Sequence, residues 1–262
     1  MRRYMISSLL VLSAISILSS CSIKEDRSPC PCWLDIFFSS FPKEGVVLAG
    51  YTSDRVFHEI VAEGDFVDFV EYTVPRVMLG VSAYRTNPSI TPNGKMVLIQ
   101  KGNQADSLYA HLSYVDCRGE FAIDTVCLHK QFATVYLSFE NSEGESVDTY
   151  DVIVKGKVNG MDLTTLRPIE GEYEFCPQIE GNNLYIFRLP RQKDDTLAIE
   201  LYRKDNGEYV DTIDAGSLIA RSGFDWNASD LQDIVICVDF AKVEIEVNVH
   251  EWDSEEIYDV TI

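Results

Sequence analysis

Short runs of β-branched and aromatic residues follow one another along most of this chain, with turn-forming residues between them. Pro42-Lys43-Glu44-Gly45 and Asp205-Asn206-Gly207 are typical of the turns that end one strand and begin the next. A helical pattern occurs in one place, from Asp214 to Arg221, and it is short. Many strands, tight turns and almost no helix together predict an all-β chain built from β-sandwiches.

The predicted strands are more numerous than one sandwich usually holds, so the sequence favours two domains. The first series comprises residues 33–38, 56–61, 66–70, 77–84, 96–100, 108–115 and 120–128. The second comprises residues 132–139, 150–158, 173–176, 184–189, 197–202, 209–213, 234–240 and 243–252, with Asn159-Gly160 expected as a break between strands. We therefore expect two tandem antiparallel β-sandwich domains, at residues 30–128 and 129–262.

Residues 1–20 have the features of a bacterial lipoprotein signal peptide. Two arginines give a positive start, the apolar run from Met5 to Leu18 is too short to span a bilayer, and Ser19-Ser20 precede Cys21. We expect cleavage before Cys21, which then carries fatty acyl chains such as palmitate, and two or more chains hold a protein stably in a membrane. Residues 21–29 would form a short charged tether between this lipid and the first domain.

The chain is strongly acidic. Its formal net charge is −20, and removal of residues 1–20, which contain two arginines and no acidic residue, brings it to −22. Such a surface repels the phosphate backbone, and we expect no nucleic-acid partner. Lys24-Glu25-Asp26, close behind Cys21, either resembles the short acidic export signals of Bacteroidota lipoproteins or is a generic solvated linker, since three charges in a row are common in such segments. The first reading predicts an outer-membrane location facing the cell exterior.

Six cysteines remain after lipidation, and an even number in an exported chain makes disulfide bonds plausible. They are Cys30, Cys32, Cys117, Cys127, Cys176 and Cys237. Cys30 and Cys32 should not pair with each other, because they lie two residues apart on an extended segment. Cys117 and Cys127 flank a predicted turn, so we expect them to pair together or with Cys30 and Cys32.

No common catalytic motif is present: the sequence lacks HExxH, a P-loop, a dinucleotide-binding GxGxxG and GxSxG. The four histidines, His58, His111, His129 and His250, are scattered, and carboxylates are too abundant for any pair to indicate a glycosidase. The Cys-Pro-Cys segment has no second cysteine or histidine pair at zinc-ligand spacing. We expect no catalytic residue, no metal site and no cofactor.

Several segments of the mature chain occur in a distinctive order behind the lipoprotein signal. They are Asp26 to Leu34, Phe187 to Arg191, Asn206 to Ile213, Leu231 to Ile236 and Val243 to Trp252. Together they resemble the FimB/Mfa-type (fimbrillin-A associated) fimbrial anchor family of Bacteroidales, over essentially the whole mature chain. The resemblance implies two transthyretin-like β-sandwiches and a non-catalytic lipoprotein that anchors a fimbrial stalk to the outer membrane and limits its length. The double cysteine Cys30-Pro31-Cys32 departs from the single Cys-Pro often found in the family.

A surface glycan-binding lipoprotein of a polysaccharide utilisation system is the alternative, since β-sandwiches on a lipid tether serve that role too. Glycan sites need exposed aromatic platforms. Trp33 and Trp252 lie in predicted strands, where core packing is the commoner role for tryptophan, and Trp226 is the best candidate platform. We expect Trp226 instead to cap the end of its sandwich.

The C-terminal tail is the candidate for binding a stalk subunit by β-strand addition, in which main-chain hydrogen bonds supply the affinity. Val243, Ile245, Val247 and Val249 alternate with polar residues, so we expect them to face the core and His250 to lie on the polar face. After a polar break, Ile257 begins a second alternating run in which Tyr258, Val260 and Ile262 share one face. This run is either a donor strand for a partner or a last edge strand of its own sandwich.

Overall fold

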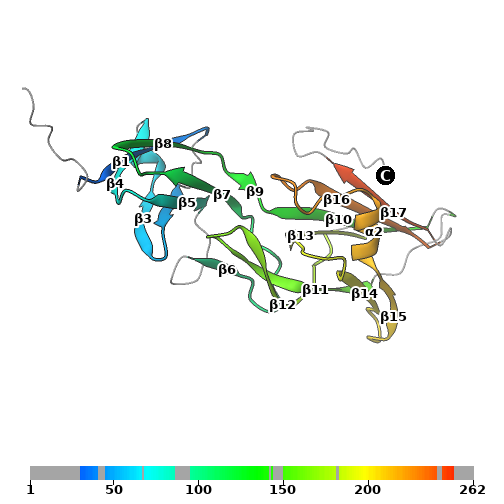
Figure 1. Ribbon diagram of the computed structural model, residues 1–262. Helices are drawn as coiled ribbons and strands as arrows, with labels where there is room; N and C mark the ends of the chain where they lie inside the picture. The colour runs from blue at the N-terminus through cyan, green and yellow to red at the C-terminus, as the bar shows by residue number, and fades with distance from the viewer. Residues whose placement is uncertain are drawn as a thin grey trace, which may run out of the picture.

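We describe a computed structural model of the chain at residues 30–40, 45–66, 68–85, 95–141, 143, 150–180, 183–240 and 244–250, with the backbone alone at positions 244 and 250. Its strands form two β-sandwiches that lie end to end (Figure 1). Strands account for most of the described residues, which confirms the predicted all-β class.

The N-terminal sandwich consists of sheets A and B. Sheet A has the strand order β4 (Phe69–Val74), β1 (Cys32–Phe38), β8 (Phe121–Val126). Sheet B has the order β3 (Arg55–Val61), β2 (Val46–Tyr51), β5 (Met78–Arg85), β7 (Tyr109–Asp116), β9 (His129–Lys130), and the 3-10 helix η1 (Glu63–Asp65) lies between β3 and β4. Alternate residues of the two sheets meet in one core, where Leu34 and Ile36 of β1 and Val81 of β5 are fully buried.

The C-terminal sandwich consists of sheets C and D. Sheet C has the strand order β12 (Arg167–Phe175), β11 (Tyr150–Asp162), β14 (Ala198–Arg203), β15 (Tyr209–Ile213). Sheet D has the order β13 (Leu184–Pro190), β10 (Phe132–Glu140), β16 (Asp233–Asp239), β17 (Glu244–His250). Helix α2 (Ala215–Arg221) confirms the predicted short helix, and the Asp214 side chain caps it by accepting a hydrogen bond from the N–H of Ser217 at 3.2 Å.

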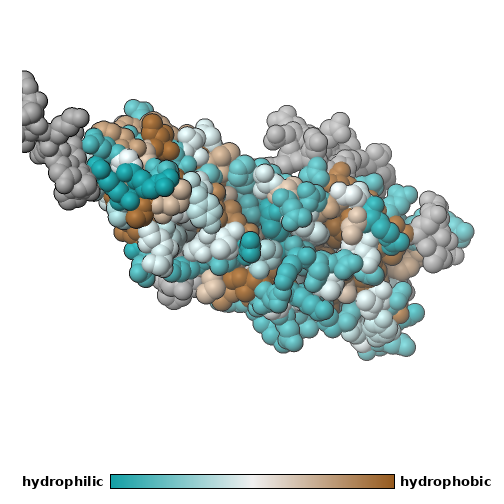
Figure 2. All heavy atoms as spheres, viewed as in Figure 1, coloured by the Kyte–Doolittle hydropathy of each residue, from teal (hydrophilic) through white to brown (hydrophobic). Residues whose placement is uncertain are grey.

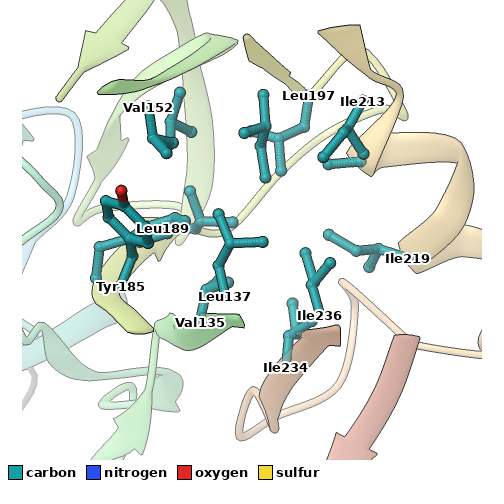
Figure 3. Close-up of a cluster of buried hydrophobic side chains, with 14 of the residues drawn as sticks. Val135, Leu137, Val152, Tyr185, Leu189, Leu197, Ile213, Ile219, Ile234 and Ile236 are labelled. Atoms are coloured by element: carbon teal, nitrogen blue, oxygen red, sulfur yellow. The ribbon is translucent and has the colours of Figure 1, made fainter. Parts of the chain in front are cut away.

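Side chains from both sheets fill the core of the C-terminal sandwich. Figure 3 shows Val135 and Leu137 of β10 and Ile236 of β16 on one side, with Val152 of β11 and Leu197 on the other. All five are almost completely buried. Burial of each such side chain stabilises the fold by about 1.5–3 kcal/mol. Ile245, Val247 and Val249 of β17 pack partly buried against this core, which confirms the predicted alternation where the structure describes the strand.

The two sandwiches repeat one strand order. In each, the first strand lies between an antiparallel and a parallel neighbour: β1 between β4 and β8, and β10 between β13 and β16. In each, the second strand lies between the third and the fifth: β2 between β3 and β5, and β11 between β12 and β14. The remaining pairings of the described strands are antiparallel. Strand β17 has no counterpart among the described strands of the N-terminal sandwich, so β8 is an edge strand whereas β16 is not.

Two features of the N-terminal sandwich differ from the sequence prediction. Strand β2 has no counterpart among the predicted strands, because all six of its residues are buried and the run lacks apolar and polar alternation. The strand predicted at residues 66–70 is displaced: Glu63–Asp65 forms η1, and β4 begins at Phe69 and continues to Val74. The continuous apolar run of β2 and the run of β4, which begins soon after η1, are both missed when strands are identified by alternation of apolar and polar residues.

The break predicted at Asn159-Gly160 is wrong, since both residues lie inside the long strand β11. Strand β6 (Met96–Leu98) pairs with β11 at this point, with Leu98 opposite Gly160. A Cβ atom at position 160 would lie 2.3 Å from the carbonyl oxygen of Val97. The glycine therefore permits close approach of two backbones and does not form a turn.

The outer face of sheet B is covered by the second sandwich. Residues of sheet B, of β6 and of the segment at the end of β11 form a small shared core, made up of Val47, Tyr84, Val97, Leu108, Ala110, Met161 and Leu163. Within this contact the buried Ser82 hydroxyl donates a hydrogen bond to the carbonyl oxygen of Leu163 at 2.8 Å. Strand β6 comes from the N-terminal part of the chain yet joins sheet C, and β9 continues sheet B directly before β10. The two sandwiches are thus connected by strand pairing as well as by side-chain packing.

Replacement of Gly160 by alanine should weaken this connection. The added Cβ can be accommodated only if β6 moves away from β11, and such overpacking costs about 1–3 kcal/mol. We expect the midpoint of urea unfolding to fall for Gly160→Ala. Gly64→Ala is the matched control, because nothing lies within 4 Å of its added Cβ. Equal midpoints for the two variants would contradict the close approach at position 160.

Candidate interaction surfaces

A small cavity in the described part of the chain lies in the contact between the two sandwiches. Its volume is about 20 Å³, and its lining includes Val97, Leu108, Met161 and Asp106. The Oδ2 atom of Asp106 is buried without a hydrogen-bond partner among the described residues. A space of this size accommodates a water molecule and is far too small for an organic cofactor.

Among the described residues, no group of three or more histidine, cysteine or acidic side chains is arranged to hold a metal ion. The histidines predicted to be scattered do lie apart, with His58 exposed on β3 and only the backbone described at His250. In the N-terminal sandwich, the Nε2 atom of His111 lies 3.9 Å from Asp124 Oδ2. Burial lowers the pKa of His111, and the carboxylate opposes that shift. His129 Nδ1 lies 2.7 Å from Asp230 Oδ2.

Two of the segments in the family resemblance have structural roles. The buried Arg191 guanidinium donates hydrogen bonds to the backbone carbonyls of Trp226 and, at 2.9 Å, Ala228, so it holds the loop before β16. Trp226 packs its ring 4.5 Å from that of Phe224 and against the core of the C-terminal sandwich. Trp226 therefore caps the end of its sandwich, as expected, and does not form an exposed platform.

The ion pair of Lys130 with Asp233 holds the start of β16. Asp233 Oδ1 accepts from the buried Lys130 ammonium at 2.5 Å and from the N–H of Thr134 at 2.9 Å. Because β10 and β16 are parallel neighbours, this carboxylate joins the beginnings of both strands. The segment from Leu231 to Ile236 thus has a structural role as well.

The outer face of sheet A is aromatic and uncovered by any described segment. We call it the aromatic face, and its members are Trp33 and Phe37 of β1, Phe69 of β4, and Phe121 and Ile123 of β8. Trp33 lies opposite Phe121 in the register, and the ring centroids of Phe37 and Phe69 are 5.3 Å apart. Trp33 is 43% exposed, Phe121 73% and Ile123 68%. The expectation that Trp33 packs in the core is wrong, because its neighbours in β1, Cys32 and Leu34, are the residues that face inward.

Two carboxylates lie in the middle row of the aromatic face. Asp35 of β1 is opposite Glu71 of β4 and Ile123 of β8. One oxygen of Asp35, Oδ1, has no hydrogen-bond partner among the described residues. Figure 2 shows hydrophobic residues reaching the surface at the end of the molecule formed by the N-terminal sandwich. Exposed apolar surface with polar groups beside it is typical of an interaction site.

Strand β17 is the edge of sheet D in the described part of the chain. It pairs with β16 along its whole length, from Asp239 opposite Glu244 to Asp233 opposite His250. The predicted donor residues Ile257, Tyr258, Val260 and Ile262 lie beyond it and outside the described residues. Cys21, the predicted lipidation site, and Trp252 also lie outside them.

The six cysteines that the structure describes are free thiols, distributed over both sandwiches. Cys32 and Cys117 are fully buried in the core of the N-terminal sandwich. Cys30 and Cys127 are exposed at opposite ends of the parallel pair β1 and β8. Cys176 is exposed after β12, and Cys237 lies half-buried on β16.

No helix in the described residues is both long and apolar enough to cross a lipid bilayer. Neither a protein-family model nor a curated protein sequence matches the chain.

Solved structures share its fold. A candidate polysaccharide-binding protein of Bacteroides thetaiotaomicron superimposes with a TM-score of 0.62 at 15% identity, over 86% of this chain and 99% of the other. A candidate adhesin of Bacteroides ovatus superimposes with a TM-score of 0.61 at 14% identity, over 87% of this chain and 97% of the other. The fimbrial anchor protein Mfa2 of Porphyromonas gingivalis superimposes with a TM-score of 0.57 at 10% identity, over 85% of this chain and 98% of the other. This chain therefore has the two-sandwich fold found in Mfa2 and in candidate adhesins of Bacteroidales.

Proposed function

We propose that this chain is a non-catalytic lipoprotein that is anchored in the outer membrane through Cys21, faces the cell exterior, and holds a fimbrial stalk there while limiting its length. The observation that carries the proposal is the match to the Mfa2 fimbrial anchor over 85% of this chain and 98% of the other. The lipoprotein signal that precedes the described residues supports it independently. In this proposal residues 30–128 and 129–262 are the two domains, and residues 1–20 are removed on export.

The way the tether joins the fold suits an anchor. The nine residues from 21 to 29 can span at most about 30 Å, so the N-terminal sandwich would stay close to the bilayer. Strand β1 follows directly and is the central strand of sheet A, hydrogen-bonded to β4 on one side and β8 on the other. A force applied to the chain through β1 is therefore resisted by the β1–β4 and β1–β8 hydrogen bonds at the same time. The packing between the sandwiches, with Ser82 bonded to Leu163, then passes the load to the second sandwich.

The partner in this proposal is a fimbrial stalk subunit, bound by β-strand addition through the C-terminal tail. Strand β1 already occupies its place in sheet A, so the N-terminal sandwich offers no groove there for a donor strand. Cleavage after Arg27 could open one only by severing the tether. The tail follows the edge strand β17, and its alternating residues Tyr258, Val260 and Ile262 suit pairing with a partner sheet.

Replacement of Cys21 by alanine tests the lipid anchor. Without the acylated cysteine the protein has no stable hold on the bilayer, and we expect it to leave the membrane fraction for the soluble fraction. Cys176→Ala is the matched control, since Cys176 is exposed on the second sandwich, and it should remain membrane-bound. Membrane retention of Cys21→Ala at the level of Cys176→Ala would refute lipidation at this position.

Deletion of residues 256–262 tests the donor strand. We expect a folded, membrane-bound protein whose cells shed their fimbriae, measured by fimbrial protein in the medium. The double variant Tyr258→Ser/Val260→Ser should shed in the same way, because both residues lie on one face of the strand. Asp259→Ser/Thr261→Ser changes the opposite face and should retain fimbriae. Loss of folding on deletion would show that the strand completes its own sandwich. Normal retention of fimbriae by a folded protein would show that it is neither a donor strand nor a necessary edge strand.

Glycan binding at the aromatic face is a second candidate function. The exposed Trp33 and Phe121 provide apolar ring surfaces, and Asp35 and Glu71 provide hydrogen-bond acceptors between the rings. The candidate polysaccharide-binding protein with the same fold supports this alternative.

Affinity electrophoresis in polysaccharide gels separates the two functions. If the aromatic face binds glycans, Trp33→Ala should abolish a retardation that the unsubstituted protein shows. Tyr209→Ala, which removes an aromatic ring that is 53% exposed on the other sandwich, should leave it unchanged. Absence of retardation on host and plant polysaccharides alike would exclude the glycan-binding function and leave the anchor.

A further inference from the structure

Two cysteines from facing sheets meet in the core of the N-terminal sandwich. Cys32 is the first residue of β1 in sheet A, and Cys117 directly follows β7 in sheet B. Both are fully buried. The N–H of Trp33 donates to the carbonyl oxygen of Glu120 at 2.9 Å, so the turn that contains Cys117 lies against the start of β1.

Both cysteines belong to the same buried core cluster, in which Cys32 is a neighbour of Cys117. Burial and the neighbouring Cys32 raise the pKa of the Cys117 thiol to about 12, which keeps it protonated in the folded protein. The surrounding side chains are apolar, with Leu34, Leu79 and Val115 in the same cluster. Nothing in this pocket would use a reactive thiolate.

The fold excludes a bond from Cys127 to Cys117 or to Cys30, and Cys30 is exposed whereas Cys117 is fully buried. Strand β8 is six residues long and separates Cys117 from Cys127 by about 20 Å, whereas a disulfide needs Cα atoms within about 7 Å. Cys30 and Cys127 lie at opposite ends of the parallel pair β1 and β8, at a similar separation.

The C-terminal sandwich offers no pair. Cys237 alternates with the buried Ile236 and Val238 of β16, so it faces away from the core on sheet D. Cys176 follows β12 in sheet C, on the other side of that core. A bond between them would have to pass through the sandwich.

We propose that Cys32 and Cys117 form a disulfide bond between sheets A and B when the chain is exported. Each cysteine gives up its thiol proton and one electron as the sulfur–sulfur bond forms. A thiol–disulfide oxidoreductase of the periplasm accepts the two electrons and two protons at its own disulfide, through a mixed disulfide, and leaves as a dithiol. The exchange takes place before the sandwich closes, while both thiols are accessible.

Such a bond would shorten the path by which load crosses the N-terminal sandwich. This consequence rests on the proposed anchoring function, in which the pull of the stalk reaches the lipid through β1. With the bond in place, the load passes from Cys32 directly to Cys117 in the opposite sheet. The segment between them, from residue 32 to residue 117, then lies outside the path of the force, and β1 cannot leave its sandwich.

A peptide map of the mature protein tests the bond without any substitution. The protein is denatured without reductant, alkylated with N-ethylmaleimide, digested and examined by mass spectrometry. We expect alkylation at Cys30, Cys127, Cys176 and Cys237, and one linked peptide pair containing Cys32 and Cys117 that separates on reduction. Alkylation of Cys32 and Cys117, or a link from either to another cysteine, would overturn the proposal.

Single-molecule pulling on the Cys21→Ala protein, from both chain ends, measures the mechanical consequence. The oxidised protein should release about 300 Å less contour length on complete unfolding than the reduced one, the span of the 85 residues from 32 to 117. Cys32→Ala/Cys117→Ala should release the longer length under both conditions, and Cys30→Ala/Cys127→Ala should behave like the unsubstituted protein. Equal lengths with and without reductant in the unsubstituted protein would contradict the bond. Because neither experiment involves fimbriae, failure of the anchor in the shedding assay and failure of the disulfide are separately visible.

Discussion

The contact between the outer face of sheet B and the second sandwich is the interaction on which the rest of this structure depends. It covers Val47 and Tyr84, which a free-standing N-terminal sandwich would expose, and it satisfies the buried hydroxyl of Ser82 through Leu163. Separation of the sandwiches would break the hydrogen bond between the Ser82 hydroxyl and the Leu163 carbonyl oxygen. It would also expose apolar surface to water. Strand β6, from the N-terminal part of the chain, pairs with β11 of sheet C and so also links the two sandwiches. The two sandwiches therefore form one elongated body, which the proposed anchor would need in order to transmit a pull between its ends.

The same strand order occurs in both sandwiches, and the differences between them lie where each meets its surroundings. In the second sandwich β17 covers the edge of β16, and α2 with its flanking loop covers the end of the core. In the first sandwich β8 is an edge, and Phe121 and Ile123 on this strand are exposed. An apolar edge strand in water invites pairing with another chain unless something covers it. The aromatic face thus has the character of an interaction surface, and it lies on the N-terminal sandwich.

The described residues offer surfaces and edges rather than a pocket. The cavity between the sandwiches holds no more than a water molecule, and the histidines make separate structural contacts with Asp124 and Asp230. Buried polar groups such as Arg191 and Lys130 are used to hold loops and strand beginnings. The fold that these contacts hold together is shared with a fimbrial anchor protein and a candidate adhesin.

Local pattern by itself determined the fold class, the approximate position of most strands, the short helix at Asp214 to Arg221 and the core-facing residues of β17, because each depends on residues close together in sequence. It could not find β2, because a strand buried on both faces has no alternation to detect. Gly160 resembled a turn residue until β6 was found against it, and Trp33 resembled a core residue until the register of sheet A placed it outside. The meeting of Cys32 with Cys117 depends on how two sheets face each other across a core. These features were decided by tertiary structure alone, since each arises from a contact between segments that are far apart in the chain.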